Sequence, residues 1–198
     1  MQLDEPDRGF SFSKEGELDM RMNQEDELSA KQIVNRYSEK ELGEIFRIYG
    51  EEKRWRKAAK AIVEARKSSP ITTTLQLCQV LMRVLGFNPH KKIHPATLVF
   101  QALRIAVNKE LQSIEKGIQA ILPFLSKGQR GGVLSFHSLE DRIVKNIFKR
   151  AAAPEKIGKE KVSIFKLLTK KPLIPSFKSI RANVRARSAK LRFIERGL

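Results

Sequence analysis

Only three short apolar runs in this chain have the pattern of β-strands, and all three lie after residue 130. These runs are residues 132–136, 162–169 and 189–196. Their apolar content is typical of a sheet that helices cover on both faces, and such sheets usually contain more than three strands. The sequence therefore predicts an α/β protein whose sheet is incomplete.

Helix signals dominate the rest of the sequence. Ser29 with Gln32, and Ser38 with Glu41, have the spacing of capping boxes at the starts of two helices. The spacing of apolar residues predicts further helices over 52–67, from Thr73 or Thr74 to Leu85, from Pro95 to about residue 125, and over 139–150.

The segments outside these helices and strands are predicted loops. Residues 151–161 and the basic stretch from Lys170 to Arg187 contain many Lys, Arg, Pro and Gly residues. Residues 1–27 lack helical periodicity, and we expect an ordered loop there that is held by the apolar side chains of Phe10, Phe12, Leu18, Met20 and Met22. The chain thus divides into an all-helical block over 12–95 and a mixed block over 96–198.

The net charge of +17 limits the classes of partner. Residues 1–50 carry a net charge of −5, whereas residues 151–198 hold 13 basic and 3 acidic side chains. One interpretation of a basic surface is that it only keeps the protein in solution. An excess of this size with clustered arginines favours a nucleic acid, since each phosphate that is neutralised releases counterions.

Several classes of site are excluded or disfavoured. The single cysteine, Cys78, excludes a disulfide framework or a multi-thiolate metal site, and its place in an apolar helix stripe predicts burial. His90 and His94 are flanked by prolines and interpreted as loop residues, so no metal site is predicted. No apolar run approaches the roughly 20 residues that span a bilayer, so no membrane association is expected.

The segment SFHSLEDR, residues 135–142, is the most suggestive local feature. A predicted buried strand ends there and places His137 and Ser138 just before a helix whose first turn holds Glu140 and Asp141. Ligands of open α/β sheets bind at the carboxyl ends of strands, which favours a binding role for both residues. The alternative is that Ser138 caps the helix and Asp141 completes a capping box.

Several long motifs together resemble the bacterial 16S ribosomal RNA cytosine-N4 methyltransferase family. They are QLDEPDRGFSF, RIYGEEKRWRKAAKAIVEAR, HPATLVFQALRIAVNKEL, GGVLSFHSLEDRIVK and ARSAKLRFIER, and the resemblance covers residues 2–196. It implies methyl transfer from S-adenosyl-L-methionine to the exocyclic amine of a cytidine in small-subunit ribosomal RNA, in the cytoplasm. It does not indicate an oligomeric state.

The resemblance also implies a fold, a Rossmann-like methyltransferase domain with an all-helical inserted domain. The glycine-rich cofactor loop of the family precedes the first motif found here, so we expect a fold that lacks its N-terminal strands. Residues 1–11 would then be the remnant of a cofactor-domain loop, 12–95 the helical insertion for substrate recognition, and 96–198 the C-terminal part of the Rossmann-like domain. The alternative is a non-catalytic RNA-binding or ribosome-associated remnant that cannot bind the cofactor.

The motifs also imply candidate site residues. Gln2 is the candidate for cofactor binding, and Asn108, His137 and Ser138 are candidates near the base, although Asn108 is equally consistent with a polar residue that ends a helix. Arg142 could bind phosphate or pair with Glu140 or Asp141. The candidates for contacts to the RNA backbone are Arg181, Arg185 and Arg187. No catalytic residue is assigned, because an acceptor for the amine proton would come from the part of the family fold that precedes these motifs.

Overall fold

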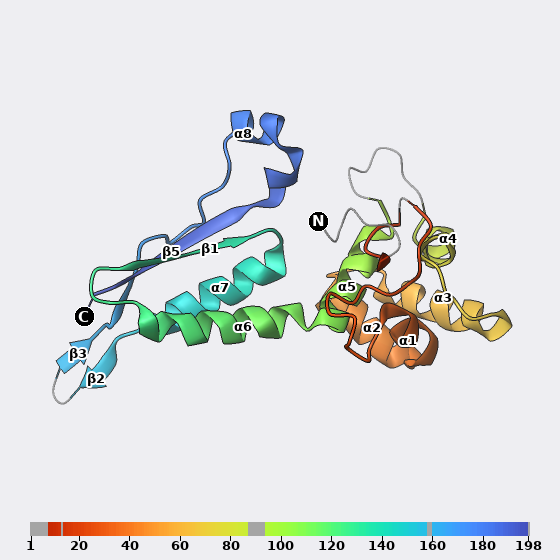
Figure 1. Cartoon of the computed structure of the whole chain (residues 1–198), viewed down its shortest axis with the longest axis horizontal. Helices are drawn as coiled ribbons and strands as arrows, with labels where there is room; N and C mark the ends of the chain where they lie inside the picture. Colours follow the sequence, from red (N-terminus) through yellow and green to blue (C-terminus); the bar gives the residue numbers. More distant parts are fainter. Residues whose placement is uncertain (1–7, 13, 87–93, 158–159, 198) are drawn as a thin grey trace. The chain divides into compact units, whose positions relative to one another are not determined.

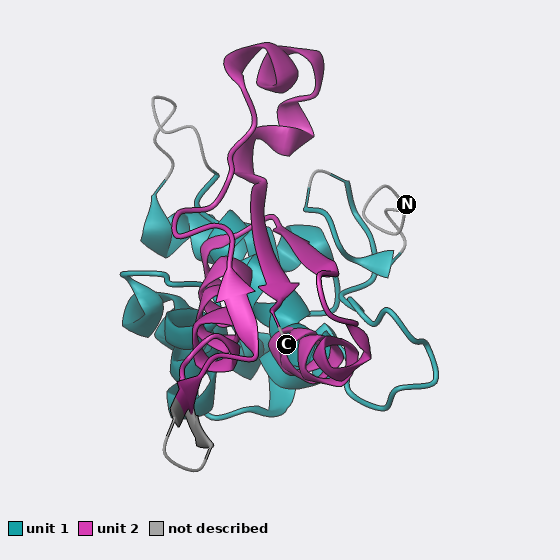
Figure 2. Ribbon diagram, turned by 90° about the vertical axis from the view of Figure 1, so that its left-hand side faces the viewer, with its two compact units in different colours: residues 1–110 teal, residues 111–198 magenta. Residues whose placement is uncertain are grey.

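The computed structural model describes residues 8–12, 14–86, 94–157 and 160–197. The chain forms two compact units, unit 1 (Met1–Glu110) and unit 2 (Leu111–Leu198) (Figure 2). Gln2 and His90, which were singled out in the sequence, lie outside the described residues. Among the described helices, none has the length and apolar character needed to cross a membrane.

The described part of unit 1 is built from helices that surround one apolar core (Figure 1). Leu42, Phe46, Ile62, Leu81 and Leu103 are fully buried in this core. The helices are α1 (Ala30–Arg36), α2 (Glu39–Ile48), α3 (Trp55–Ser68), α4 (Thr74–Leu85) and α5 (Thr97–Asn108).

Local side-chain caps set where three of these helices begin. The capping boxes of Ser29 and Ser38 are both formed, as the sequence predicts. Of the two threonines considered for α4, Thr73 is the cap, and Gln76 completes its capping box. Helix α3 begins at Trp55 rather than at residue 52, and its first turn has no side-chain cap.

The loop before α1 is ordered by burial, with one exception to the prediction. Leu18 and Met20 are buried, and Phe10 and Phe12 pack against the core of unit 1. Met22 is exposed, so the prediction that it anchors the loop is wrong.

The single long helix predicted after Pro95 is in fact two helices. Helix α5 ends at Asn108, and Lys109 takes a left-handed conformation with φ of 50°, which a residue with a Cβ adopts only at an energetic cost. Helix α6 then runs over Glu110–Ile121 and is followed by a 3-10 turn, η3 (Leu122–Phe124). The continuous apolar stripe serves two different cores, because the side chains of α5 lie in unit 1 and those of α6 pack in unit 2.

Unit 2 contains a three-stranded antiparallel sheet in the order β1-β5-β4. Its strands are β1 (Arg130–Ser135), β4 (Phe165–Leu167) and β5 (Lys190–Arg196), which confirms the three predicted strands with shorter bounds for the second. Helix α7 (Ser138–Ala151) joins β1 to the rest of the unit. Ile118 of α6 and Ile147 of α7 pack with Ile194 of β5 in one core.

Two predicted loops of unit 2 contain regular structure. Residues 151–161 include β2 (Glu155–Ile157), which pairs with β3 (Glu160–Val162) in a separate antiparallel ladder. The basic stretch from Lys170 to Arg187 contains helix α8 (Phe177–Ala182) and most of a 3-10 helix, η4 (Val184–Ser188).

The sheet of unit 2 is not covered on both faces, which corrects the expectation from its apolar runs. Successive residues of a strand point to opposite faces, and Val133 of β1 faces the helices together with Ile194. Its neighbour Leu134 is exposed. Among the described residues of unit 2, only the face that carries Val133 packs against α6 and α7.

The boundary between the two units follows Glu110, whereas the sequence predicts that the all-helical block ends at residue 95. Helix α5 belongs to unit 1, because Val99, Phe100 and Leu103 lie in its buried core. The inserted helical domain and the Rossmann-like remainder stay predictions, since compactness does not reveal which segments of a fold were inserted.

Gly50 provides a test of the close packing between α2 and α5. A Cβ atom built on Gly50 would lie 2.6 Å from the carbonyl oxygen of Leu98 and 2.7 Å from that of Phe46. We expect Gly50→Ala to lower the free energy of unfolding of unit 1 by about 1–3 kcal/mol, measured by urea titration of Trp55 fluorescence. The control is Gly117→Ala in α6, where the new Cβ meets nothing within 4 Å and should stabilise the helix by about 0.5–1 kcal/mol in circular dichroism. An unchanged midpoint for Gly50→Ala would contradict the packing argument.

Candidate functional site

The turn between β1 and α7 places a cluster of polar groups where the strand ends. Strand β1 ends at Ser135, and His137 is the cap of α7. Nδ1 of His137 accepts a hydrogen bond from the backbone N–H of Glu140 at 3.4 Å. In return, the Glu140 carboxylate accepts hydrogen bonds from the backbone N–H groups of Phe136 at 2.6 Å and His137 at 3.3 Å.

This reciprocal pair shifts the predicted helix cap by one residue. Ser138 is the first residue of α7 rather than its cap, and Glu140 rather than Asp141 completes the capping box. The binding interpretation of His137 and Ser138 is not decided by this geometry and stays a prediction. The geometry does show that one nitrogen of the His137 ring is used for capping.

The other nitrogen of His137 faces a carboxylate. Its Nε2 atom lies 3.2 Å from Oε1 of Glu140, within ion-pair distance, yet it is buried and has no aligned hydrogen-bond partner among the described residues. Burial alone would raise the pKa of Glu140, but the contact with the His137 ring and the backbone N–H donors outweigh it and lower that pKa. Glu140 is therefore held as an anion, and it is a polar group of this site that was not among the predicted candidates.

Asp141 in the same turn is paired with strand β5. Its carboxylate accepts hydrogen bonds from Nε and Nη2 of Arg192 at 2.6 and 3.1 Å, and Nζ of Lys190 lies 3.8 Å away. The side chains of Arg192 and Asp141 are only 7% and 13% exposed. The hydrogen bond from Arg192 outweighs burial and lowers the pKa of Asp141. Sequence proximity favoured Arg142 as a possible partner for Asp141, whereas the actual partner, Arg192, is 51 residues away and no local pattern indicates it.

Asn108 has a structural task in unit 1. Its amide nitrogen donates to the carbonyl oxygens of Met20 at 2.8 Å and Arg104 at 2.9 Å, and its amide oxygen accepts from the N–H of Met22 at 2.7 Å. Met20 has a positive φ of 63°, so these bonds fix a loop in an unfavourable backbone conformation. Both amide hydrogens are in use, and a contact to a base would have to involve the amide oxygen.

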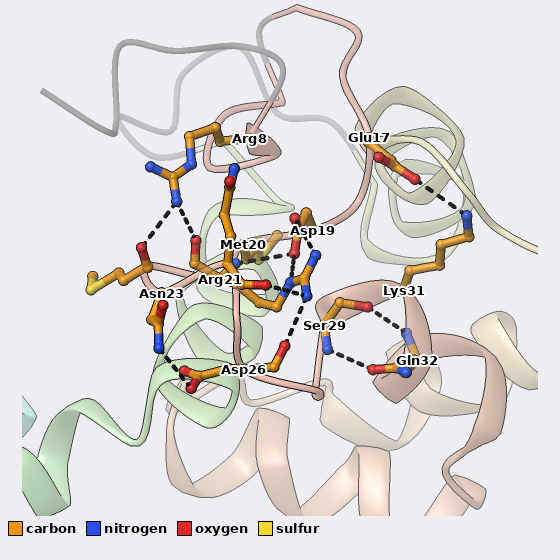
Figure 3. Close-up of polar contacts among 12 residues, drawn as sticks. Arg8, Glu17, Asp19, Met20, Arg21, Asn23, Asp26, Ser29, Lys31 and Gln32 are labelled. Atoms are coloured by element: carbon orange, nitrogen blue, oxygen red, sulfur yellow. Dashed lines mark hydrogen bonds and ion pairs between the residues drawn. The ribbon is translucent and has the colours of Figure 1, made fainter.

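A second polar cluster lies in the loop before α1 of unit 1 (Figure 3). Arg21 binds the Asp19 carboxylate through Nε at 2.6 Å and Nη2 at 3.1 Å, and its Nη1 donates to the carbonyl oxygens of Gln24 and Asp26. The hydrogen bond to Asp19 raises the pKa of Arg21. Arg8 also donates to the backbone of this loop. No candidate residue was predicted in this cluster, although Asp and Arg alternate in LDMRM, residues 18–22.

The remaining candidates for RNA contacts lie on the surface of unit 2. Arg142 is exposed on α7, and Arg181, Arg185 and Arg187 are exposed in α8 and η4. The guanidinium carbon of Arg181 lies 4.7 Å from the centre of the Phe177 ring. These residues fall into two places in the unit, the start of α7 and the segment around α8.

Cys78 is buried and His94 lies outside the helices and strands, as the sequence predicts. Cys78 is buried in unit 1, and burial raises the pKa of its thiol. The ring of His94 stacks on Phe12 with 4.6 Å between the ring centres, which is consistent with a packing role.

A mixed helix and sheet architecture with a polar cluster after a strand is compatible with an α/β methyltransferase. The sequence profile of the MraW methylase family matches residues 1–197. The chain therefore belongs to the MraW methylase family. S-adenosyl-L-methionine is the methyl donor of this family, but the one residue predicted to contact it, Gln2, lies outside the described residues.

Comparison with individual proteins also finds methyltransferases. A protein of Protochlamydia amoebophila named ribosomal RNA small subunit methyltransferase H is 51% identical over 98% of this chain and 64% of its own length. Proteins of the same name from Fusobacterium nucleatum and Halothermothrix orenii are 46% and 45% identical, over 98% and 100% of this chain and 64% and 66% of their own lengths. The chain thus spans somewhat less than two thirds of the curated relatives it matches.

The ion pair between Asp141 and Arg192 predicts a pH-dependent loss of stability. Asp141→Asn leaves a buried guanidinium without its counterion, and we expect the free energy of unfolding of unit 2 to fall by about 3–5 kcal/mol. Because the pKa of Asp141 is lowered in the folded state, the wild-type contribution is complete above about pH 4 and is lost as the pH falls through that lowered pKa. Urea titrations at several pH values, followed by hydrogen exchange of β5, measure both effects.

The control for this variant is an exposed ion pair of the same unit. Oε1 of Glu115 lies 3.3 Å from Nη2 of Arg150, and both side chains are well exposed to solvent. Glu115→Gln should therefore cost less than about 1 kcal/mol. Equal losses for Glu115→Gln and Asp141→Asn would contradict the role given to Arg192.

Proposed function

We propose that this chain takes part in methyl transfer from S-adenosyl-L-methionine to the exocyclic N4 amine of a cytidine in small-subunit ribosomal RNA. The observation that carries the proposal is the family match over residues 1–197, together with relatives at about half identity that are named as small-subunit ribosomal RNA methyltransferases. A ribosomal RNA substrate implies that the protein acts in the cytoplasm.

This reaction requires mainly that the amine nitrogen and the methyl carbon are aligned. The cofactor would supply the methyl group as an electrophilic carbon. The amine nitrogen would form its bond to that carbon as the bond from the carbon to the sulfonium sulfur breaks, so that S-adenosyl-L-homocysteine leaves and the amine nitrogen releases a proton. A protein accelerates such a step by holding the two reactants in line and by placing dipoles where charge develops. In this proposal Gln2 contacts the cofactor, and Asn108, His137 and Ser138 lie near the base.

The polar turn at the start of α7 supports its proposed part in this arrangement. His137 and Glu140 fix each other through the capping box, and Asp141 fixes the same turn to β5 through Arg192. Side chains held in this way lose little conformational entropy when a ligand binds. Arg142, the fifth residue of α7, is exposed and is the proposed phosphate contact there.

The basic residues of unit 2 support an RNA substrate. From residue 161 to residue 194 the sequence contains ten Lys and Arg residues and no Asp or Glu. Arg192 and Lys190 of this stretch pair with Asp141, and the other eight basic residues give it a positive charge that attracts phosphates. We assign Arg181, Arg185 and Arg187 to contacts with the RNA backbone.

Methyl transfer tests the proposal directly. We expect the purified chain, supplied with radiolabelled S-adenosyl-L-methionine and unmethylated small ribosomal subunits, to label the RNA, with N4-methylcytidine identified by mass spectrometry of the nucleosides. Calorimetry with the cofactor alone accompanies this assay. RNA binding without cofactor binding and without label would overturn the enzymatic proposal in favour of a non-catalytic RNA-binding protein.

The three arginines give a second test, based on salt dependence. Replacing Arg181, Arg185 and Arg187 by Gln should lower the slope of log Kd against log salt by about 2, since each contact to single-stranded RNA contributes about 0.7. Filter binding across a range of salt concentrations measures the slope. A control variant with the same loss of charge replaces Lys116, Lys127 and Lys149, which are exposed elsewhere in unit 2. Equal slopes for the two variants would show that only net charge matters.

A further inference from the structure

A segment of unit 2 projects from the sheet as an arm, which we define as residues 173–191. Two backbone hydrogen bonds of 2.9 Å, between the N–H and C=O groups of Leu173 and Leu191, close its base. Figure 2 shows α8 and η4 at the far end of this arm, beyond the strands of the unit. The arm is thus tied to β5 at its base and extends away from the core of unit 2.

The arm keeps its shape through local polar contacts rather than through a core. Ser176 caps α8 by accepting from the N–H of Ser179 at 3.2 Å, and Asn183 caps η4 by accepting from the N–H of Arg185 at 3.0 Å. All residues from 171 to 190 are described, and none of them is buried. The apolar side chains of the arm therefore contribute no core packing.

These apolar side chains lie in the solvent. Phe177 is 69% exposed, Ile174 is 73% exposed and Val184 is 69% exposed. Apolar groups clustered on an exposed segment leave area in contact with water that a binding partner can cover. A partner for the arm must therefore offer an apolar or aromatic surface.

Charge identifies the class of that partner. Residues 170–190 contain seven Lys and Arg residues and no acidic residue. An acidic or phosphate-rich partner with flat apolar groups matches this combination, and RNA offers both in its phosphates and bases. Stacking requires a base whose face is not covered by a neighbour, as in single-stranded loops and bulges rather than in duplexes.

We infer that the arm binds an unpaired stretch of RNA, with a base stacked on Phe177 and phosphates held by the surrounding basic side chains. This inference rests on the proposed function for the identity of the ligand as RNA. The guanidinium of Arg181 lies over the Phe177 ring at 4.7 Å from its centre, so a base on this ring also comes within reach of a cation. The arm thereby distinguishes unpaired RNA from duplex RNA, which phosphate contacts alone do not.

The test compares a short single-stranded RNA with a duplex of the same sequence, by fluorescence anisotropy with the full chain. We expect Phe177→Ala and Phe177→Leu to weaken binding of the single strand by about fivefold or more, the effect of losing one stacked base. Binding of the duplex should stay within about twofold, because no phosphate contact is removed. Phe177→Tyr keeps an aromatic face and should bind as the wild type does.

Phe124 provides the matched control. It is 84% exposed, belongs to η3 of the same unit and lies outside the arm, so Phe124→Ala should leave both affinities unchanged. Equal losses for single strand and duplex, wild-type affinity of Phe177→Ala, or wild-type affinity of Phe177→Leu would each overturn the inference. If Phe177→Ala lost binding to phosphatidylserine vesicles but kept its affinity for RNA, the inference would be overturned in favour of a membrane surface as the partner of the arm.

This outcome is separate from that of the proposed function. The binding assay contains no cofactor and measures no methyl transfer. Selective loss of single-strand binding by Phe177→Ala in an inactive chain would support the arm and overturn the enzyme. Methylation by a chain whose Phe177→Ala variant binds single strand and duplex as the wild type does would support the enzyme and overturn the arm.

Discussion

The ion pair between Asp141 and Arg192 is the interaction on which the organisation of unit 2 depends. Asp141 lies in the first turn of α7 and Arg192 near the start of β5, so a largely buried, bidentate contact fixes the helix start against the strand. A buried pair contributes little net stability compared with apolar packing, but a slip of one residue in β5 would turn Arg192 to the other face of the sheet and break this pair. The polar turn of His137 and Glu140 lies at the start of α7, which this contact holds against β5.

Much of the fold follows from patterns that are local in the sequence. The capping boxes at Ser29 and Ser38 need only residues three positions apart, and both are formed. The three strands are also found where apolar runs predict them. The left-handed Lys109 escaped prediction because the apolar stripe continues across it, and only the presence of two separate cores explains the break.

In the candidate site, too, local sequence patterns predict the position of the turn but not the distant residues that bind it. Sequence spacing identified the turn at residues 135–142, and the structure makes that turn a polar cluster with one residue of difference in the cap. Arg192, the partner that holds this turn, is 51 residues from Asp141 in the sequence. Asn108 bonds to Met20 and Met22 across more than eighty residues, and no periodicity encodes such a contact.

Strand β5 links the two surfaces that the proposals assign to RNA. Leu191 and Arg192 are consecutive residues, so their side chains lie on opposite faces of the sheet. The main chain of Leu191 closes the base of the arm, while the side chain of Arg192 holds the start of α7. One strand thus sets the distance between the turn of His137 and the base of the arm. Because both attachments are made by adjacent residues, an RNA bound as proposed to both surfaces would span a separation that strand β5 fixes.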